Sequence, residues 1–334
     1  MTANVPLNAW YAVAAAREVG RTPLARRLAG ERIVAYRDSH GDAVVLVDRC
    51  AHRPVALSEG RVEGDDLIAP YTGWRYGPDG RCVSVPTQPN VPVGAGVRSY
   101  PVHEDGSFVW VWAGEPGAAK LRRPPSTDWL RSEGWAHLGN SWETKASLRM
   151  LQDNFADITH VAQVDADIAP PALLGSDVHP LDVKVTETSV SFRRSYPATA
   201  VAPWQAQVMG LDESGSYPQV EEGEFVSPGL WVDRWTVNAD VAKTFVFTHA
   251  LTPLDDSTTG HIWTVSRNFA LGAAAEGTLR PIFERYYQTV RDILEGMQGL
   301  VDSDGPREEI HLAADAALTQ VRRIMDRLVA DEAR

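Results

Sequence analysis

The sequence is poor in cysteine, in positive charge and in long apolar runs. Its 334 residues include two cysteines, which cannot build a disulfide-stabilised fold. Lys and Arg number 32 against 44 Asp and Glu, so the net charge is -12. Nucleic acids and anionic membrane surfaces are bound by clustered positive charge, so we expect neither as a partner. Charges interrupt every apolar stretch before the roughly 18 residues of a membrane-spanning helix.

What remains is the composition of an ordinary globular protein. Apolar residues make up 44% of the chain, and its length is sufficient for two domains or one large one. The first residues carry no signal-peptide pattern, so we expect a cytoplasmic protein.

The first third of the chain predicts short strands. Residues 32–37 and 43–47 are β-rich runs separated by a turn, which favours a hairpin. Further strands are expected at 82–85 and 108–112, each after a Gly-containing turn. These signals predict a small all-β domain over residues 1–115. A stretch rich in Pro, Gly and Arg follows, and we assign residues 116–136 to a linker.

The rest of the chain mixes strands and helices. Residues 148–164 carry apolar side chains at helical spacing without Pro or Gly, which predicts one helix. Residues 183–196 alternate apolar and polar positions, as a half-exposed strand does. We therefore predict an α+β domain over residues 137–334, in which an antiparallel sheet packs on helices. Its other expected elements are strands at 230–237, 244–251 and 261–269, and helices at 279–298 and 308–330.

Two segments carry most of the chemical information. Residues 48–54 (DRCAHRP) and 69–74 (APYTGW) resemble the Rieske domain of ring-hydroxylating and O-demethylating oxygenases. Residues 153–165 (DNFADITHVAQVD) resemble the iron-binding helix of the same family. Shorter matches at 8–11, 249–253 and 263–267 extend the resemblance over nearly the whole chain. It is similar to the Rieske non-heme iron oxygenases of the vanillate O-demethylase and dicamba monooxygenase type. The resemblance implies a Rieske-like β domain and a helix-grip catalytic domain.

The resemblance implies an iron–sulfur cluster held by two cysteines and two histidines. Cys50 and His52 stand at the first pair of ligand positions. The second pair falls on Ala69 and Thr72, where the ligands are lost, and Cys82 lies beyond the following turn. We therefore interpret Cys50 and His52 as vestigial and expect no assembled cluster.

The resemblance also implies a mononuclear iron held by two histidines and a carboxylate. His160 stands at the first histidine position, but Asp165 replaces the second. The carboxylate position falls on Val290, or on Tyr286 if the helix is shifted by one turn. We expect no cofactor; the alternative is a remodelled single-metal site of His160, Asp157, Asp165 and water.

The three polar residues that remain predict a metal-independent active site. Asp157 and His160 would share a helix face, and the resemblance brings Asp165 to the same cavity. A histidine between two carboxylates has a raised pKa and can act as a general acid or base. We therefore expect Asp157, His160 and Asp165 to be catalytic in a cyclase, isomerase, lyase or hydrolase. Its substrate would be a small organic metabolite of specialised metabolism.

The substrate pocket has its own candidates. The resemblance places the strand beginning at His249 along the pocket, which makes His249 the strongest of them. The full set of expected substrate-binding residues is Asn154, Trp204, Trp231, Trp235, His249 and Trp263.

Other interpretations stay open. The chain can be a non-catalytic paralogue subunit or a metabolite binder that assembles with an active Rieske oxygenase. It can also be a Rieske-type monooxygenase or demethylase with a remodelled metal site. The resemblance implies a trimer, either of identical chains or with a paralogue, in which Asp157 lies at the subunit interface. Structural roles are the simpler alternative for His160 as a core residue, Asp157 as its hydrogen-bond partner and Asp165 at a helix end.

Overall fold

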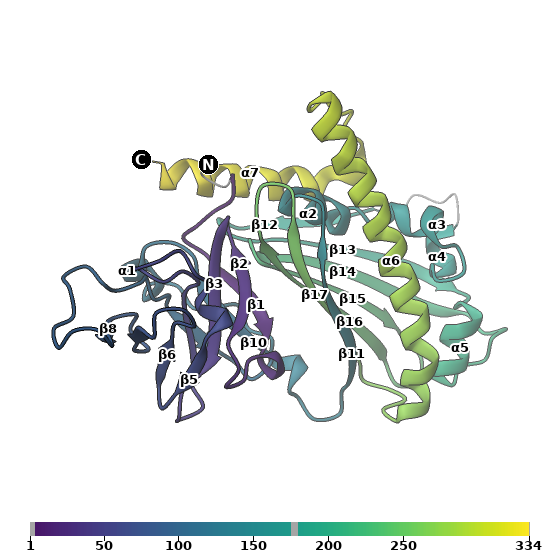
Figure 1. The fold of residues 1–334 in the computed structure, drawn as a ribbon. Coiled ribbons are helices and arrows are strands. Elements are labelled where there is room, and N and C mark those ends of the chain that lie inside the picture. The colour runs from purple at the N-terminus through teal and green to yellow at the C-terminus, as the bar shows by residue number, and fades with distance from the viewer. Residues whose placement is uncertain (1–3, 175–179, 334) are drawn as a thin grey trace. The chain divides into compact units, whose positions relative to one another are not determined.

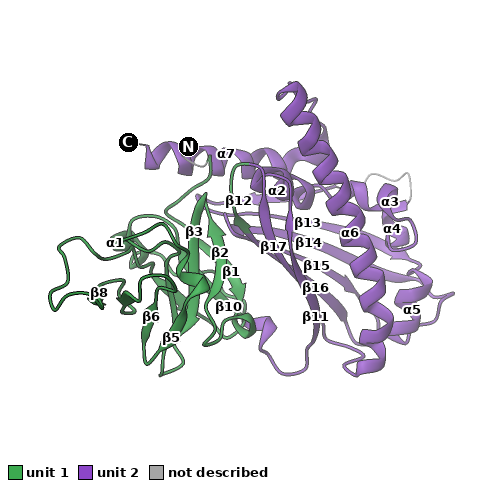
Figure 2. Cartoon of the chain, in the orientation of Figure 1, with its two compact units in different colours: residues 1–127, 252–256 green, residues 128–251, 257–334 purple. Residues whose placement is uncertain are grey.

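The computed structural model describes residues 4–174 and 180–333. The chain forms two compact units, coloured separately in Figure 2. Unit 1 comprises Met1–Thr127 and Thr252–Asp256, and unit 2 comprises Asp128–Leu251 and Ser257–Arg334. The domain limits expected from the sequence, at 115 and 137, remain predictions.

Unit 1 consists of short strands in small sheets (Figure 1). The predicted hairpin at 32–37 and 43–47 is confirmed as the antiparallel pair β3 and β4, whose apolar side chains pack in the core of this unit. The strand orders are β1-β10-β9, β2-β3-β4 and β5-β6-β7-β8. The strands are β1 Trp10–Ala15, β2 Leu24–Leu28, β3 Glu31–Arg37, β4 Ala43–Val47, β5 Arg61–Glu63, β6 Asp66–Ile68, β7 Arg75–Tyr76, β8 Cys82–Ser84, β9 Val102–Glu104 and β10 Phe108–Trp112. Short helices are η1 Ala16–Glu18, η2 Leu57–Glu59 and α1 Pro116–Ala119.

Unit 2 is built on one large antiparallel sheet, which has seven strands within the described residues. The strand order is β11-β17-β16-β15-β14-β13-β12. The strands expected at 230–237, 244–251 and 261–269 are present as β15, β16 and β17. The bounds are β11 Ala136–Thr144, β12 Asp182–Val185, β13 Val190–Thr199, β14 Tyr217–Ser227, β15 Leu230–Val237, β16 Lys243–Pro253 and β17 Thr259–Arg267. The α+β fold class is confirmed.

One long helix covers a face of this sheet. Helix α6, Ala273–Asp304, crosses the sheet in Figure 1. Its buried side chains, among them Leu279, Phe283, Tyr287 and Val290, recur every three or four residues and so form one apolar stripe facing the sheet. The other helices of unit 2 are η3 Asp128–Leu130, α2 Leu148–Ala156, η4 Ile158–His160, α3 Val161–Val164, α4 Pro171–Leu174, α5 Pro203–Met209, η5 Ala313–Asp315 and α7 Ala316–Glu332.

Two predicted elements are wrong in form. The single helix expected at 148–164 ends at Ala156, and Asp157 adopts an extended conformation before η4 and α3 begin. The Asp157 carboxylate accepts hydrogen bonds from Thr159 N and Oγ1, and such local bonds compete with helical ones. The single strand expected at 183–196 is a hairpin, because the chain turns at residues 186–189 between β12 and β13.

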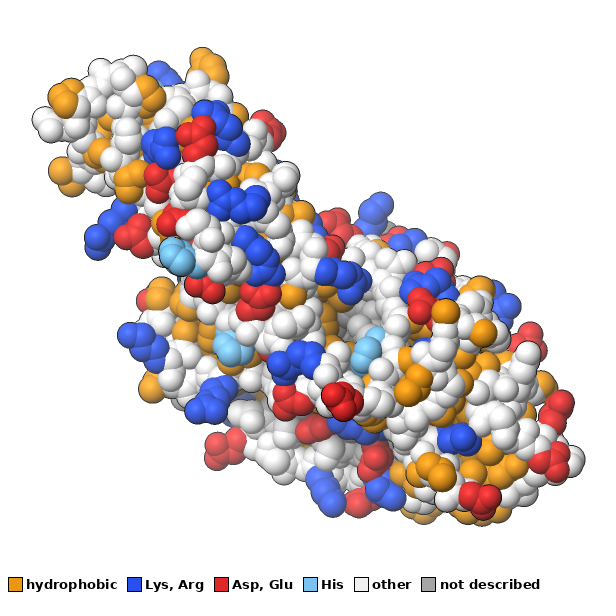
Figure 3. Space-filling model, turned by 90° about the horizontal axis from the view of Figure 1, so that it is seen from below, with side chains coloured by type: hydrophobic (Ala, Val, Ile, Leu, Met, Phe, Trp, Pro, Cys, Tyr) orange, Lys and Arg blue, Asp and Glu red, His pale blue; other side chains and the backbone are white. Residues whose placement is uncertain are grey.

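The surface charge and the helices can be compared with two expectations from the composition, namely the lack of clustered positive charge and of a membrane-spanning helix. On the face drawn in Figure 3, basic and acidic side chains alternate and no broad basic patch is visible. In the described ranges, no helix is long and apolar enough to cross a membrane.

Candidate functional site

A pocket in unit 2 lies between the large sheet and helix α6. Side chains on the covered face of the sheet come from alternate residues of adjacent strands, because successive residues of a strand point to opposite sides. Pairing of Trp235 with Phe245, and of Asp233 with Phe247, fixes which residues share that face. Phe283, Tyr286 and Val290 of α6 line the opposite wall. The sheet register and the helix stripe therefore build the pocket together.

Most of the pocket wall is aromatic. The Trp204 ring lies 5.9 Å from that of Phe245 and 5.8 Å from that of Phe283. Phe247 lies 5.9 Å from Phe245, and Trp235 lines the same cavity. The cavity volume of about 120 Å³ is close to the roughly 150 Å³ of an apolar cavity that binds benzene. Its size and lining suit a molecule with a single aromatic ring.

Two carboxyl groups stand at the polar part of this wall. Glu221 is buried, and its Oε2 accepts hydrogen bonds from Tyr196 at 2.6 Å and Arg194 at 3.3 Å. Asp233 Oδ1 accepts a hydrogen bond of 2.8 Å from Trp231 Nε1. Burial raises the pKa of Glu221, and it raises that of Asp233 well above its ordinary value.

A pair of buried histidines adjoins Asp233. His249 Nδ1 and His261 Nε2 are 3.0 Å apart, and His249 Nε2 lies 3.7 Å from Asp233 Oδ2. The Phe155 ring stacks on His249 with a 4.0 Å separation of ring centroids. Burial lowers the pKa of His261 to about 3 and lowers that of His249 well below its ordinary value. Both imidazoles are therefore neutral near pH 7.

His160 lines the pocket with its ring nitrogens already bonded. Nδ1 lies 2.9 Å from the Asp157 carbonyl oxygen and must donate to it, because a carbonyl can only accept. Nε2 is then the acceptor and receives the Tyr286 hydroxyl at 3.1 Å. Burial lowers the pKa of His160, whereas the sequence suggested a raised pKa. The correction follows from geometry, because the Asp157 carboxylate bonds to Thr159 instead of facing the ring.

Asp165 is engaged elsewhere. Its carboxylate accepts hydrogen bonds from the Arg285 guanidinium at 2.9 and 3.2 Å and from the backbone N–H groups of Asp167 and Ile168. Asp165 therefore caps α3 and ties it to α6. In the described structure Asp157, His160 and Asp165 do not form a three-residue cluster.

The expected substrate-binding residues divide into two groups. Asn154, Trp204, Trp235 and His249 line the pocket. Trp231 and Trp263 are fully buried beneath it, where Trp231 holds Asp233 through the hydrogen bond described above.

Cys50 lies in the core of unit 1. Its Sγ is 3.3 Å from Tyr76 Oη and 3.7 Å from Thr72 Oγ1. Tyr76 Oη also accepts the Ala51 N–H, so this hydroxyl links the sulfur to the backbone. Burial opposes ionisation of Cys50, yet the Tyr76 hydroxyl and nearby backbone N–H groups lower the pKa of its thiol overall.

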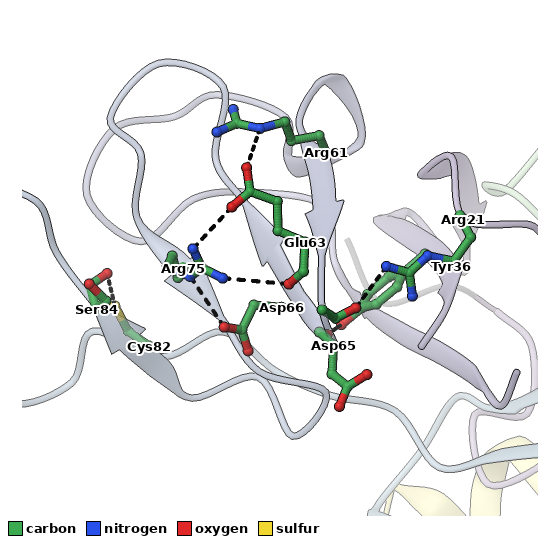
Figure 4. A network of polar contacts seen from close by, with 10 residues as sticks. Arg21, Tyr36, Arg61, Glu63, Asp65, Asp66, Arg75, Cys82 and Ser84 are labelled. Atoms are coloured by element: carbon green, nitrogen blue, oxygen red, sulfur yellow. Dashed lines mark hydrogen bonds and ion pairs between the residues drawn. The ribbon is translucent and has the colours of Figure 1, made fainter. Parts of the chain in front are cut away.

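The neighbouring positions of the cluster motif offer few metal ligands. Ala69 is buried and forms a tight turn, donating its N–H to Trp74 O and accepting the Gly73 N–H. His52 is exposed and stacks on Trp74 with ring centroids 4.9 Å apart. Cys82 points to the Ser84 carbonyl at 3.5 Å, at the edge of the network in Figure 4.

Within the described residues, one group of three side chains brings potential metal ligands together. It consists of Asp38, His40 and Asp65 at an exposed turn of unit 1. The Asp38 carboxylate accepts the backbone N–H groups of His40 and Asp42, and Asp65 accepts that of Ser39. These hydrogen bonds to the backbone show that the two carboxylates stabilise the turn, which accounts for their proximity.

The two units correspond to the two parts of a Rieske-type oxygenase chain. Residues 9–101 match the model of the Rieske [2Fe-2S] domain. Residues 144–331 match the model of the vanillate O-demethylase oxygenase C-terminal domain. Because the second match alone spans more than half of the chain, the chain belongs to the vanillate O-demethylase family of Rieske oxygenase subunits.

Individual relatives are similar to this chain over nearly their full lengths. The chain is 28% identical to the toluene-4-sulfonate monooxygenase system iron-sulfur subunit of Comamonas testosteroni, over 97% of each chain. It is 28% identical to a vanillate O-demethylase oxygenase subunit of a Pseudomonas strain, over 98% of this chain and 96% of the relative. Its fold matches dicamba monooxygenase bound to 3,6-dichlorosalicylic acid with a TM-score of 0.91 at 23% identity, covering 98% and 99% of the two chains.

These findings correct the expected function. A metal-independent cyclase, isomerase, lyase or hydrolase is contradicted, because the relatives are subunits of oxygenase systems. The expectation of no cofactor is contradicted as well. The N-terminal match is to an iron–sulfur domain, and one similar dicamba monooxygenase structure contains non-heme iron. The family implies iron-dependent oxygenation.

The sequence analysis missed both carboxyl groups of the pocket. Asp233 lies between Trp231 and Trp235 on the covered face of β15, where alternation predicts a third large apolar side chain. Glu221 interrupts the same face of β14. The sequence did show a polar residue at a position where alternation predicts a buried one. Recognising it required knowing where both strands begin and end.

Proposed function

We propose that this chain is a substrate-binding subunit of an iron-dependent Rieske-type oxygenase system and binds a small aromatic molecule in the pocket of unit 2. The observation that carries the proposal is the aromatic cavity between the sheet and α6. The homologous structures support it, since they bind 3,6-dichlorosalicylic acid, dicamba or caffeine.

We also propose that both metal-binding sites of the family are incomplete in this chain. A Rieske cluster requires two thiolates and two imidazoles, whereas Ala69 has no donor atom and Thr72 offers a hydroxyl. At the second site Val290 is apolar, the Asp165 carboxylate binds Arg285, and His160 Nε2 accepts a hydrogen bond from Tyr286. These residues do not fit either iron centre, so no reaction step is assigned to a metal on this chain.

The oxygenation itself would then take place on chains with complete ligands. We propose that this chain assembles with such a paralogue, most simply in a mixed trimer, and binds the aromatic compound within that assembly. A homotrimer and a cytoplasmic location remain predictions from the sequence.

The binding step is tested on the full chain by calorimetry with single-ring aromatic compounds. Val290→Phe should fill the cavity and weaken binding at least tenfold, because its side chain lines the wall. Ile293→Phe is the matched control, since Ile293 lies on the same helix and is 44% exposed. Equal binding by both variants would contradict the pocket as the binding site.

The subunit role is tested by iron and sulfide analysis after expression with ample iron and anaerobic purification. We expect iron well below the three atoms that a complete family chain implies, one cluster of two and one mononuclear centre. Co-expression with a metal-complete paralogue should yield a stable complex. Full iron loading together with turnover by this chain alone would overturn the subunit role.

A second candidate is a Rieske-type monooxygenase or demethylase with a remodelled metal site. The observations that favour it are the matches to the Rieske and vanillate O-demethylase models and the position of His160 on the pocket wall. Iron(II) binding that His160→Ala abolishes, followed by oxygenation of an aromatic compound, would select this candidate over the first.

A further inference from the structure

The polar part of the pocket is made of two carboxyl groups and neutral imidazoles. Glu221 Oε1 is buried and has no hydrogen-bond partner, while its Oε2 is bound to Tyr196 and Arg194. Asp233 Oδ2 lies 3.7 Å from the neutral His249. In the register of the antiparallel strands β14 and β15, Glu221 lies opposite Trp235 and Gly223 lies opposite Asp233. The two carboxyl groups are thus diagonal neighbours on one face, which places them roughly 7–8 Å apart.

Two arginines lie near this part of the cavity, and each is already engaged. Among the described lining residues, Arg234 is the basic one, apart from the neutral imidazoles. Its position in β15 is out of phase with Asp233, and its guanidinium lies over the Trp129 ring at 5.4 Å. The Arg194 guanidinium is already paired with Glu221. A ligand carboxylate would therefore be buried beside two carboxyl groups, with the nearest guanidinium already paired to Glu221, which is unfavourable.

A ligand cation would find the opposite environment. Asp233 can supply a negative charge once a cation lies beside it, and Glu221 Oε1 can accept an N–H. The rings of Trp235 and Phe247 line the same pocket as the two carboxyl groups. The faces of aromatic rings attract ammonium groups. Trp204 Nε1 is a buried donor without a hydrogen-bond partner, and it can donate to an oxygen on the ligand's ring.

We propose that the pocket selects a small aromatic amine, whose ring occupies the aromatic wall and whose ammonium group is held by Asp233 and Glu221. This inference rests on the proposed binding function and specifies the class of compound. Gly223 contributes by leaving room for Asp233, because a Cβ there would lie 2.8 Å from Asp233 Oδ1.

The test uses three probes of matched shape and different charge on the full chain: benzylamine, benzyl alcohol and benzoate. Affinities are measured by calorimetry and by quenching of tryptophan fluorescence. We expect benzylamine to bind at least tenfold more tightly than benzoate, with benzyl alcohol between them. Asp233→Asn and Glu221→Gln should each weaken benzylamine binding about tenfold and leave benzyl alcohol binding nearly unchanged. Glu224→Gln is the control, because Glu224 lies on the opposite face of β14 and is half-exposed.

The outcomes separate the two levels of the argument. Benzoate binding as tightly as benzylamine would overturn the amine preference and leave the pocket function standing. Failure of all three probes to bind would overturn the binding function and the amine preference together. Should either variant fail to fold, as circular dichroism would show, the ranking of probes on the unchanged protein still decides.

Discussion

His249 and His261 are buried in their neutral form at the pocket. Their burial makes the stability of the fold depend on pH. In the unfolded chain both imidazoles titrate near their ordinary pKa of about 6.5. Burial lowers the folded-state pKa of His261 to about 3. Below about pH 6.5 the unfolded chain therefore binds protons that the folded chain does not, so this contribution to stability is lost as the pH falls toward 3.

We predict that His261→Gln makes the chain less sensitive to acid. On going from about pH 6 to about pH 5, the unfolding free energy of the unchanged protein should fall by roughly 1 kcal/mol more than that of the variant. Urea unfolding at each pH measures this difference. His40→Gln is the control for replacing a histidine at the surface, because the His40 side chain is 75% exposed. Parallel slopes for His261→Gln and the unchanged protein would show that His261 binds protons equally in the folded and unfolded chains, which would contradict its lowered pKa.

Gly223 is a second residue on which the pocket depends. It pairs with Phe192 on one side and Asp233 on the other. A Cβ at this position would lie 2.3 Å from the Phe192 ring, closer than any real contact. Because Phe192 is buried, the ring cannot move without disturbing the core.

We predict that Gly223→Ala destabilises the chain by about 1–3 kcal/mol through overpacking. It should also weaken amine binding, since Asp233 is displaced. The matched control is Gly296→Ala in α6, where a Cβ meets nothing within 4 Å. That substitution should stabilise the helix by about 0.5–1 kcal/mol, because glycine is a poor helix former. Denaturant unfolding measures both, and a stabilising effect of Gly223→Ala would contradict the close packing.

At the scale of elements, the break between α2 and α3 orients His160 toward the pocket. Asp157 ends α2 and caps η4, and its carbonyl fixes the His160 ring. We predict that Asp157→Ala costs about 1 kcal/mol of unfolding free energy, the usual cost of a lost N-cap. Asp167→Ala nearby is the control and should be neutral, because its carboxylate is exposed. Equal stability of the two variants would remove the capping role of Asp157.

The same segment shows what the sequence could and could not predict. Strongly periodic elements such as β15 and α6 were found because their buried faces repeat regularly. The break at Asp157 was missed because the apolar spacing of residues 148–164 continues through it. The pocket carboxyls Glu221 and Asp233 were missed because their positions depend on the register of two strands. Local pattern thus predicted the elements, whereas pairing between elements created the polar part of the site.

At the scale of the whole molecule, the chain has the fold of the vanillate O-demethylase family, and the proposed loss of metal ligands concerns a few side chains. The turn at Ala69 keeps the tight backbone of the cluster motif, with its N–H bonded to Trp74 O and its carbonyl accepting the Gly73 N–H. Cys50 is directed toward Thr72, with Sγ and Oγ1 3.7 Å apart. We therefore propose that the donor atoms are lost at the side chains alone, with the backbone turn still formed.

Restoring those side chains should restore metal binding. We predict that Ala69→Cys combined with Thr72→His raises iron and acid-labile sulfide toward two atoms each per chain and produces cluster absorption, because the loops at residues 50–52 and 69–72 would then each supply one thiolate and one imidazole. Adding Cys82→Ala should not reduce this gain, since the Cys82 thiol faces the Ser84 carbonyl. Iron and sulfide analysis with visible and electron paramagnetic resonance spectra measures the change. A fully loaded cluster in the unchanged protein would contradict the loss of ligands, whereas an empty double variant with native circular dichroism would show that the frame has changed as well.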